Sequence, residues 1–385
     1  MEDNALMRMS AKWVAVCALN VVLAAIIQAA PLGEPVLTDR DRYEAYAEHL
    51  GDRAWFNRTD PVSGLRTLPD RIYPYRVLVP VALAQLPFDS GTRWRLYRWG
   101  ATATAGVIVA ATAHSLAGSM AAAVLASLLS QGSFGFAFTA YDPYSPDPFV
   151  FVCLALMAWC WLHDAWPLAF AIGAIGLFGK ETVVLMSGAT ALASLIPPRR
   201  RSWPLWFAQG PSLLALLLMF RLSFDEYVGW GHNLADGQVI QNSLTGGGWL
   251  ALWMQGNPVP NQLFLIFAVF SVAWIFALVA VRHSPPDLLK LTIGAAPLFL
   301  ALVYVQNPER ALGNLFFVVV PLAVVTLSCV PFWMGLIAAT LGTAISVRAA
   351  TASDWLPASK VTIPLAMLAA AGVLWTYSRT PLRNE

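Results

Sequence analysis

Long apolar runs separated by short polar breaks are the feature that most limits what this 385-residue chain can fold into. The chain is 58% hydrophobic and 12% charged, whereas a soluble domain is about 45–50% apolar and about 25% charged. In hydrocarbon, a run of about 20 apolar residues can satisfy its backbone groups as an α-helix. The pattern therefore predicts an all-α, polytopic helical bundle in a lipid bilayer.

The apolar runs predict about twelve transmembrane helices, and a count of about eleven or thirteen also fits because several runs are short. The predicted spans are 13–31, 97–115, 117–135, 148–163, 165–179, 182–197, 203–222, 260–282, 290–305, 311–329, 331–349 and 361–378. We expect residues 1–385 to form a single transmembrane domain. Two long loops belong to it, residues 32–96 with interfacial helices and residues 223–259.

The distribution of Lys and Arg predicts the orientation, because short loops rich in these residues stay on the cytoplasmic side. With the amino terminus inside, the inside loops carry more of them, including Arg199, Arg200, Arg201 and Arg282. Both termini are then cytoplasmic and both long loops extracytoplasmic, in a bacterial inner membrane. The formal net charge of +2 and the lack of a long basic run argue against a nucleic-acid partner.

The first long loop contains two acidic residues at the start of a helical pattern. Tyr43, Tyr46 and Leu50 recur at helical spacing, which predicts an amphipathic helix on the membrane surface. Asp39 and Asp41 fall just before its expected first turn, where a carboxylate caps a helix or is favoured by its dipole. The two acids are therefore candidates either for capping or for chemistry.

Tyr75 and Arg76 lie within the same loop and precede the apolar run 77–84. That run is too short to span, so it suits a re-entrant or interfacial segment with the ring and the guanidinium at headgroup depth. The alternative is that such an arginine simply contacts lipid phosphates. Asp142 and Asp147, at the mouth of the fourth span, could line a polar pocket or form a stiff turn.

Lys180, Glu181 and Arg310 are charged residues bordered by apolar sequence. Ionisable groups at membrane depth are costly and tend to mark function, although residues near a helix end can reach the interface. Glu309 beside Arg310 offers a neutralising ion pair as the alternative explanation. On the predicted topology all three charged residues fall on the same face as the long loops.

The order of these pieces resembles the GT-C superfamily of membrane glycosyltransferases, which includes the polyprenyl- and dolichyl-phosphate-sugar mannosyltransferases. The resemblance covers most of the chain. It rests on the acidic site, on Tyr43-x-x-Tyr46-Ala47, on Tyr75-Arg76-Val77-Leu78-Val79-Pro80, on Asp147-Pro148, on Lys180-Glu181 and on Arg310 before the Pro321 span.

The resemblance implies a cell-envelope enzyme that moves a sugar from a polyprenyl-phosphate donor to an extracytoplasmic acceptor with inversion. Asp39 or Asp41 would be the general base, and in some members the acidic site also helps to hold a divalent cation, Mg²⁺ or Mn²⁺. Substrate-binding roles would fall to Tyr75, Arg76, Asp142, Asp147, Lys180, Glu181 and Arg310.

This sequence departs from the family pattern in two ways. It has Asp-Arg-Asp where several members have adjacent acids, so which carboxylate is the base stays open. It also ends just after its last expected span, which favours a small or lipid-linked acceptor. A secondary transporter or lipid carrier and a non-catalytic assembly subunit are the alternatives, although no internal repeat of the kind found in carriers is detectable.

Overall fold

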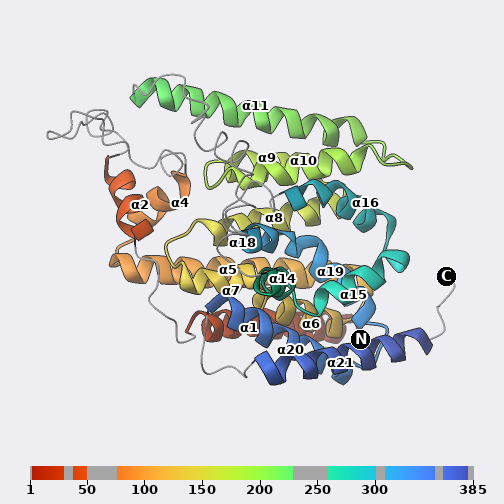
Figure 1. Ribbon diagram of the computed structural model, residues 1–385. Helices are drawn as coiled ribbons and strands as arrows, with labels where there is room; N and C mark the ends of the chain where they lie inside the picture. Colours follow the sequence, from red (N-terminus) through yellow and green to blue (C-terminus); the bar gives the residue numbers. More distant parts are fainter. Residues whose placement is uncertain are drawn as a thin grey trace.

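In the computed structural model, each predicted span corresponds to one or more helices (Figure 1). The structure describes residues 2–29, 38–49, 76–228, 259–300, 308–351 and 359–379, and no strand occurs within these ranges. The α-helices are α1 (Glu2–Gln28), α2 (Thr38–His49), α4 (Leu78–Ala84), α5 (Ser90–Ala117), α6 (Met120–Gln131), α7 (Phe134–Tyr141), α8 (Asp147–Leu162), α9 (Trp166–Gly176), α10 (Thr182–Ser194), α11 (Trp203–Val228), α14 (Val259–Ala268), α15 (Ala273–Ala280), α16 (Pro286–Ala295), α18 (Pro308–Leu312), α19 (Phe316–Leu327), α20 (Phe332–Thr351) and α21 (Ser359–Arg379). Short 3-10 turns occupy Val281–His283, Ala296–Leu300 and Gly313–Leu315.

Among the described residues, 6 helices are long and apolar enough to cross a membrane, and a bent pair formed by α6 and α7 would make 7. These helices identify the chain as an integral membrane protein. The expected twelve spans are not confirmed, because several predicted spans fold as short helices. With 11 residues, α9 is about 17 Å long, well short of a hydrocarbon core of about 30 Å.

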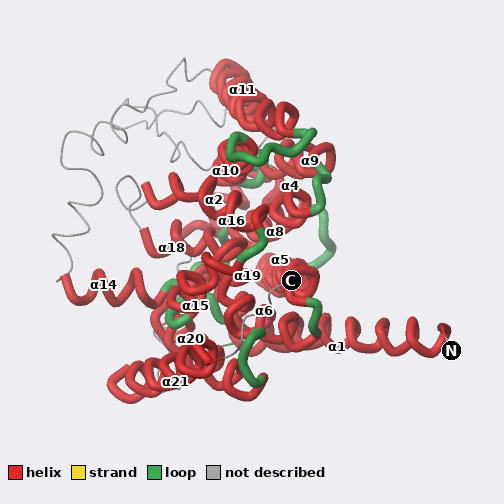
Figure 2. Tube along the Cα trace, turned by 90° about the vertical axis from the view of Figure 1, so that its right-hand side faces the viewer, coloured by secondary structure: helices red, strands yellow, loops and turns green. Residues whose placement is uncertain are grey.

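The loops between helices gather at two ends of the bundle. At one end, Arg200 Nη2 lies 2.6 Å from Asp287 Oδ2, and Trp161 Nε1 donates to the carbonyl of Asp287 at 2.9 Å. At the other end lie α2, α4, α18 and the loops before α8 and α10, which we call the α2 end (left in Figure 1). Figure 2 looks along many of these helices, with α1 running across them.

The first long loop is shorter than predicted, because α5 begins at Ser90 instead of residue 97. Asp89 caps the helix by accepting a hydrogen bond from the Thr92 amide at 3.0 Å. Arg98, which the sequence placed at the start of the predicted span, is buried within α5. Its Nη1 donates to Gln28 Oε1 at 2.8 Å and to the Thr139 carbonyl at 3.0 Å, which compensates the burial of its charge.

Two predicted spans are interrupted, and the two interruptions touch. The helices α6 and α7 meet at an angle of 42°. The predicted span 260–282 divides into α14 and α15 around Ser271, whose φ is 49°. The amide of Phe134, at the start of α7, donates to the carbonyl of Val269 at 3.0 Å. Backbone groups released by one interruption thus bond to the other.

A buried amide network holds α1 on the bundle. Asn20 Nδ2 donates to Ser127 Oγ at 2.8 Å, and Gln131 Nε2 donates to Asn20 Oδ1 at 3.1 Å. Gly106 leaves room for these side chains, since a Cβ there would overlap both amides. Within α1, Ala11–Gln28 is long and apolar enough to cross a membrane, and the helix packs against α5 and α6.

Candidate functional site

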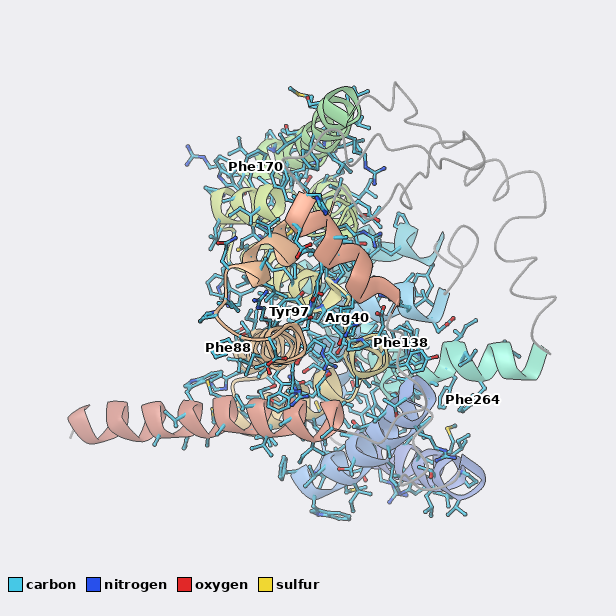
Figure 3. All side chains as sticks on the ribbon, turned by 90° about the vertical axis from the view of Figure 1, so that its left-hand side faces the viewer. Arg40, Phe88, Tyr97, Phe138, Phe170 and Phe264 are labelled. Carbon is cyan, nitrogen blue, oxygen red and sulfur yellow. The ribbon has the colours of Figure 1, made fainter. Side chains whose placement is uncertain are left out.

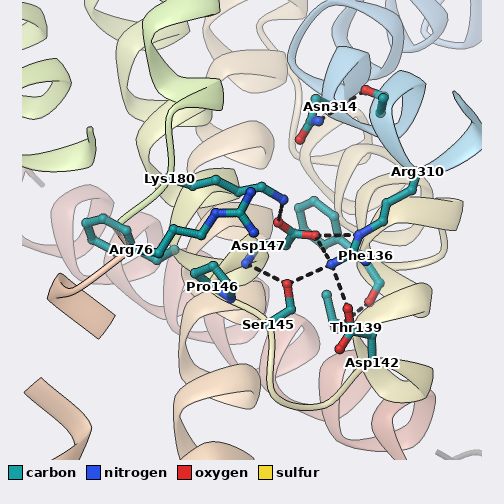
Figure 4. Close-up of polar contacts among 12 residues, drawn as sticks. Arg76, Phe136, Thr139, Asp142, Ser145, Pro146, Asp147, Lys180, Arg310 and Asn314 are labelled. Atoms are coloured by element: carbon teal, nitrogen blue, oxygen red, sulfur yellow. Dashed lines mark hydrogen bonds and ion pairs between the residues drawn. The ribbon is translucent and has the colours of Figure 1, made fainter. Parts of the chain in front are cut away.

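Asp147, in the first turn of α8, lies between two cations from distant parts of the chain (Figure 4). Lys180 Nζ, from the loop between α9 and α10, donates to Asp147 Oδ1. Arg310 Nε, from α18, donates to Asp147 Oδ2 at 2.8 Å. A carboxylate at a helix amino terminus is favoured by the helix dipole, and here it also orients two positive charges.

Arg310 makes its contacts through Nε and Nη2. Nη2 lies 2.6 Å from Asp142 Oδ2 and 2.7 Å from Asp147 Oδ2, and it donates to Ser145 Oγ at 2.8 Å. The guanidinium also lies 5.1 Å from the centre of the Phe138 ring. The loop between α7 and α8 therefore fixes the orientation of this arginine.

Two glycines allow Arg310 to reach that loop. Gly313, just after α18, packs against Gly135 of α7, and a Cβ on Gly313 would lie 3.0 Å from Gly135 Cα. A larger residue at Gly313 would push α18 away from α7, whereas a Cβ on Gly135 would lie 3.4 Å from Gly313 Cα. The short α18 thereby brings its arginine next to Asp142 and Asp147.

A second ion pair joins the loop before α4 to the loop before α10. Arg76 Nη2 lies 2.7 Å from Glu181 Oε1, and Arg76 Nε donates to Glu181 Oε2 at 3.2 Å. This two-point geometry orients the planar guanidinium. The amide of Leu78 also donates to the carbonyl of Phe178 at 3.1 Å, so the two segments are fixed side by side.

Aromatic side chains connect α2 to these ion pairs. Tyr43 is buried against Trp94 of α5, with ring centres 6.0 Å apart, and its hydroxyl accepts a hydrogen bond from Arg76 Nη1 at 3.4 Å. Arg40, one turn earlier in α2, lies over the Tyr144 ring at 5.7 Å. Figure 3, which faces the α2 end, labels Arg40. The first turn of α2 therefore lies next to the loop that holds Arg310.

Three cations and three carboxylates make up this cluster, so its formal charge is zero. The cluster consists of Arg76, Lys180 and Arg310 with Asp142, Asp147 and Glu181. The side chains of Asp142 and Asp147 are 3% and 10% exposed, whereas that of Arg310 is 26% exposed. The acids therefore lie beneath a more accessible arginine and hold it in place.

Burial shifts the pKa values of Glu181 and Lys180, in the α9–α10 loop, in opposite directions. Burial would raise the pKa of Glu181, but the charge and hydrogen bonds of Arg76 outweigh it and lower that pKa to about 2. Burial lowers the pKa of Lys180, and the charge of Asp147 opposes this change. Both groups therefore depend on their partners to stay charged in this buried position.

The structure brings together six of the residues singled out from the sequence: Arg76, Asp142, Asp147, Lys180, Glu181 and Arg310. Tyr75 lies outside the described residues, and so do the side chains of Asp39 and Asp41. The backbone of both aspartates is described, and it corrects their expected position. Because α2 begins at Thr38, they lie within its first turn and not before it.

Glu309 is not the partner of Arg310, contrary to the alternative drawn from their adjacency. Arg310 pairs with Asp142 and Asp147, while Glu309 Oε2 is buried and has no hydrogen-bond partner within the described part of the chain. Sequence reasoning also missed Tyr43 and Arg40 as contact residues. Their only available signal was helical spacing, which indicated an apolar face without identifying its partner.

The divalent cation implied by the resemblance has no ligand set among the described side chains. No group of three or more His, Cys, Asp and Glu side chains is placed to hold a metal ion in the described ranges. Asp142 and Asp147 are engaged by cationic side chains instead. The side chains of Asp39 and Asp41, to which the resemblance assigns the cation, lie outside the described residues, so the divalent cation stays a prediction.

Comparison with known proteins does not add a family assignment. No protein-family model matches this chain, and no curated protein matches it. The functional argument therefore depends on the chemistry of the cluster and on the resemblance in pattern.

We expect the Arg76–Glu181 pair to couple α4 to the α9–α10 loop by about 0.5–3 kcal/mol in a double-mutant cycle of unfolding free energies. Arg76→Gln alone and Glu181→Gln alone should each lower the free energy of unfolding more than the double variant does. Because the pKa of Glu181 falls from 4.5 to about 2 on folding, the coupling is complete above pH 4.5 and is lost as the pH falls towards 2. Purely additive effects at pH 7 would show that the pair contributes nothing.

Proposed function

We propose that this protein is a membrane glycosyltransferase that moves a sugar from a polyprenyl-phosphate donor to an extracytoplasmic acceptor. The observation that carries the proposal is the convergence of Arg76, Lys180 and Arg310 beside the first turn of α2. Acidic and basic groups separated by long stretches of sequence meet at one end of an apolar bundle. Such convergence is expected of a site for a charged, membrane-anchored substrate.

The cations suit the leaving group of this reaction. The oxygen of an acceptor hydroxyl forms a bond to the anomeric carbon, and the bond from that carbon to the phosphate oxygen breaks. The hydroxyl proton passes to a carboxylate, and the phosphate leaves with the bonding electron pair and an added negative charge. Cations that are already oriented, as Asp147 orients Lys180 and Arg310, stabilise that charge without reorganising.

The general base in this proposal is Asp39, and the register of α2 supports the choice. Asp39 precedes Tyr43 by four residues, so the two positions lie on the same side of the helix. That is the side on which Tyr43 meets Arg76. Asp41 precedes Glu44 by three residues and lies on a different side of the helix, that of Glu44, which accepts a hydrogen bond from Ser90.

The carrier alternative has less support. Carriers tend to place ionisable groups near the membrane midplane, at interrupted helices. Between α6 and α7, and between α14 and α15, the interrupting residues are Gly132, Ser133, Val269, Phe270, Ser271 and Val272. None of these is ionisable, and they pack against each other or against neighbouring helices.

The proposal requires the α2 end to face the extracytoplasmic side. We therefore expect a cysteine at Gln85, which is exposed between α4 and α5, to react with an impermeant maleimide in intact cells. A cysteine at Arg201, exposed at the opposite end, should react only after permeabilisation. The background needs Cys17→Ala and Cys329→Ala, because both native thiols are exposed. The reverse labelling pattern would contradict the orientation.

The activity itself is tested with purified protein in lipid nanodiscs. A set of polyprenyl-phosphate sugars, each radiolabelled in the sugar, is supplied with membrane-extract lipids as acceptors. We expect one donor to lose its label to an acceptor or to water, and Arg310→Gln to abolish this turnover. If no donor in the set is consumed, or if Arg310→Gln consumes it at the wild-type rate, the proposed function is wrong.

A further inference from the structure

A pocket lies on the far side of Tyr43 and Trp94 from the ion cluster. Its volume is about 410 Å³, within the range of about 300–1,000 Å³ that small-molecule sites occupy. It is lined by Glu44, Ala47, Glu48, Pro80, Leu83, Ala84, Ser90, Arg93 and Trp94. The helices α2, α4 and α5 each contribute part of the wall.

The chemistry of the wall suits a polyhydroxylated ligand. Two carboxylates accept hydrogen bonds from hydroxyl groups, and the guanidinium of Arg93 donates them. Arg93 Nε is buried and has no hydrogen-bond partner among the described residues, so the protein does not engage every donor of this guanidinium. On the opposite wall, Pro80, Leu83 and Ala84 offer the apolar surface that the C–H face of a sugar ring needs.

The charge of the pocket argues against an anionic ligand. Glu44 and Glu48 outnumber Arg93, so a phosphate entering here would meet net repulsion. The cationic groups that suit phosphate lie instead in the cluster around Asp147. The α2 end thus separates a place for phosphate from a place for a neutral ring.

The pocket lies close to the residues of the proposed reaction. Trp94 lines the pocket and also packs against Tyr43 and Tyr144, which contact Arg76 and Arg40. A single aromatic layer therefore separates the pocket from the cluster. The exposed Phe88, labelled on the left of the bundle in Figure 3, and the exposed Leu86 follow α4 beside the pocket, on a surface suited to the membrane interface.

We propose that the pocket between α2, α4 and α5 binds the sugar ring of the acceptor, with Glu44, Glu48 and Arg93 as its hydrogen-bonding groups. This inference rests on the proposed function, because the donor then binds at the ion cluster and the acceptor approaches from the pocket side of α2. The ring is neutral, and either a soluble glycoside or the headgroup of a glycolipid can present it.

Cysteine protection tests binding without requiring activity. Ala47→Cys lines the pocket, and Leu86→Cys, exposed outside it, is the matched control; both are made with Cys17→Ala and Cys329→Ala. In nanodiscs, methyl mannoside, glucoside and galactoside are tested, together with the dodecyl glycoside of each sugar. One sugar should slow maleimide labelling of Ala47→Cys about tenfold at ten times its Kd and leave Leu86→Cys unaffected.

The two glycoside forms distinguish the sources of the ring. Protection by the methyl glycoside indicates a soluble acceptor, and protection by the dodecyl form alone indicates a lipid-linked one. If no glycoside protects Ala47→Cys, or if both cysteines are protected equally, the pocket is not an acceptor site.

Kinetics separate failure of this inference from failure of the proposed function. With an active donor, Glu48→Gln should raise the KM for the acceptor about tenfold with little change in kcat, since one hydrogen bond to a charged group is lost. Asp89→Asn, an exposed acid outside the pocket, should change neither constant. An unchanged KM in Glu48→Gln overturns the pocket assignment while the transferase proposal stands. Glycoside protection without turnover of any donor overturns the proposed function and leaves a sugar-binding pocket.

Discussion

Replacing Asp147 with asparagine is expected to lower the free energy of unfolding by about 3 kcal/mol and to abolish sugar transfer. The substitution leaves Lys180 and Arg310 buried at the α2 end without the carboxylate that both contact. Uncompensated buried charge is among the few changes that destabilise a protein this strongly. Unfolding in mixed detergent micelles measures the stability, and the radiolabelled-donor assay measures the transfer.

A second substitution tests this explanation. Asp147→Asn leaves Lys180 without its carboxylate, whereas Arg310 keeps Asp142, so adding Lys180→Gln should recover part of the lost stability without restoring activity. Asp89→Asn is the matched control, because this exposed acid caps α5 and asparagine caps a helix equally well, so we expect a change below about 0.5 kcal/mol. If Asp147→Asn is as stable as the wild type, the cluster does not hold the α2 end together.

The second large effect concerns the two aspartates of α2. We expect Asp39→Asn to reduce sugar transfer by about 10²–10⁴-fold, the usual contribution of a positioned general base. Asp41→Asn should retain most of the activity, because its place in the helix register is towards Glu44 and not towards Arg76. Single-turnover rates with bound donor give the comparison, since they report the chemical step.

Both variants preserve side-chain volume and a residue able to cap a helix, so the fold should be unaffected. Equal unfolding free energies of the two variants serve as the control. A large loss in Asp41→Asn with none in Asp39→Asn would show that the register argument selects the wrong carboxylate. Unimpaired transfer in both would show that neither is the base.

Much of the secondary structure followed from hydrophobic pattern, but several boundaries did not. The predicted span began at residue 97 and so contained Arg98, but it missed the first turns of α5, which begins at Ser90 and includes Arg93 and Arg95. The structure includes Arg98 in α5 by pairing it with Gln28 and with the Thr139 carbonyl, partners that lie far away in sequence. The interruption at Ser271 was also missed, since neither Gly nor Pro marks it. It is stabilised by contact with the start of α7.

The site, like the helix boundaries, could be predicted from the sequence only in part. Lys180, Glu181 and Arg310 were recognised individually, because charged residues between apolar runs are conspicuous in sequence. Their partners were not recognisable, and the adjacent Glu309 was the wrong choice for Arg310. In a helix, immediate neighbours in sequence point in different directions, whereas tertiary packing can bring distant residues within bonding distance.

The sequence by itself determined that this chain is helical, that lipid is the solvent for most of it, and that its charges lie mainly near helix ends. These properties follow from local composition, because the cost of exposing backbone and charge to hydrocarbon is paid residue by residue. The tertiary structure alone decided that Asp142 and Asp147 hold Arg310, and that Tyr43 brings the first turn of α2 beside Arg76. Those contacts depend on how the helices pack, which no local pattern encodes.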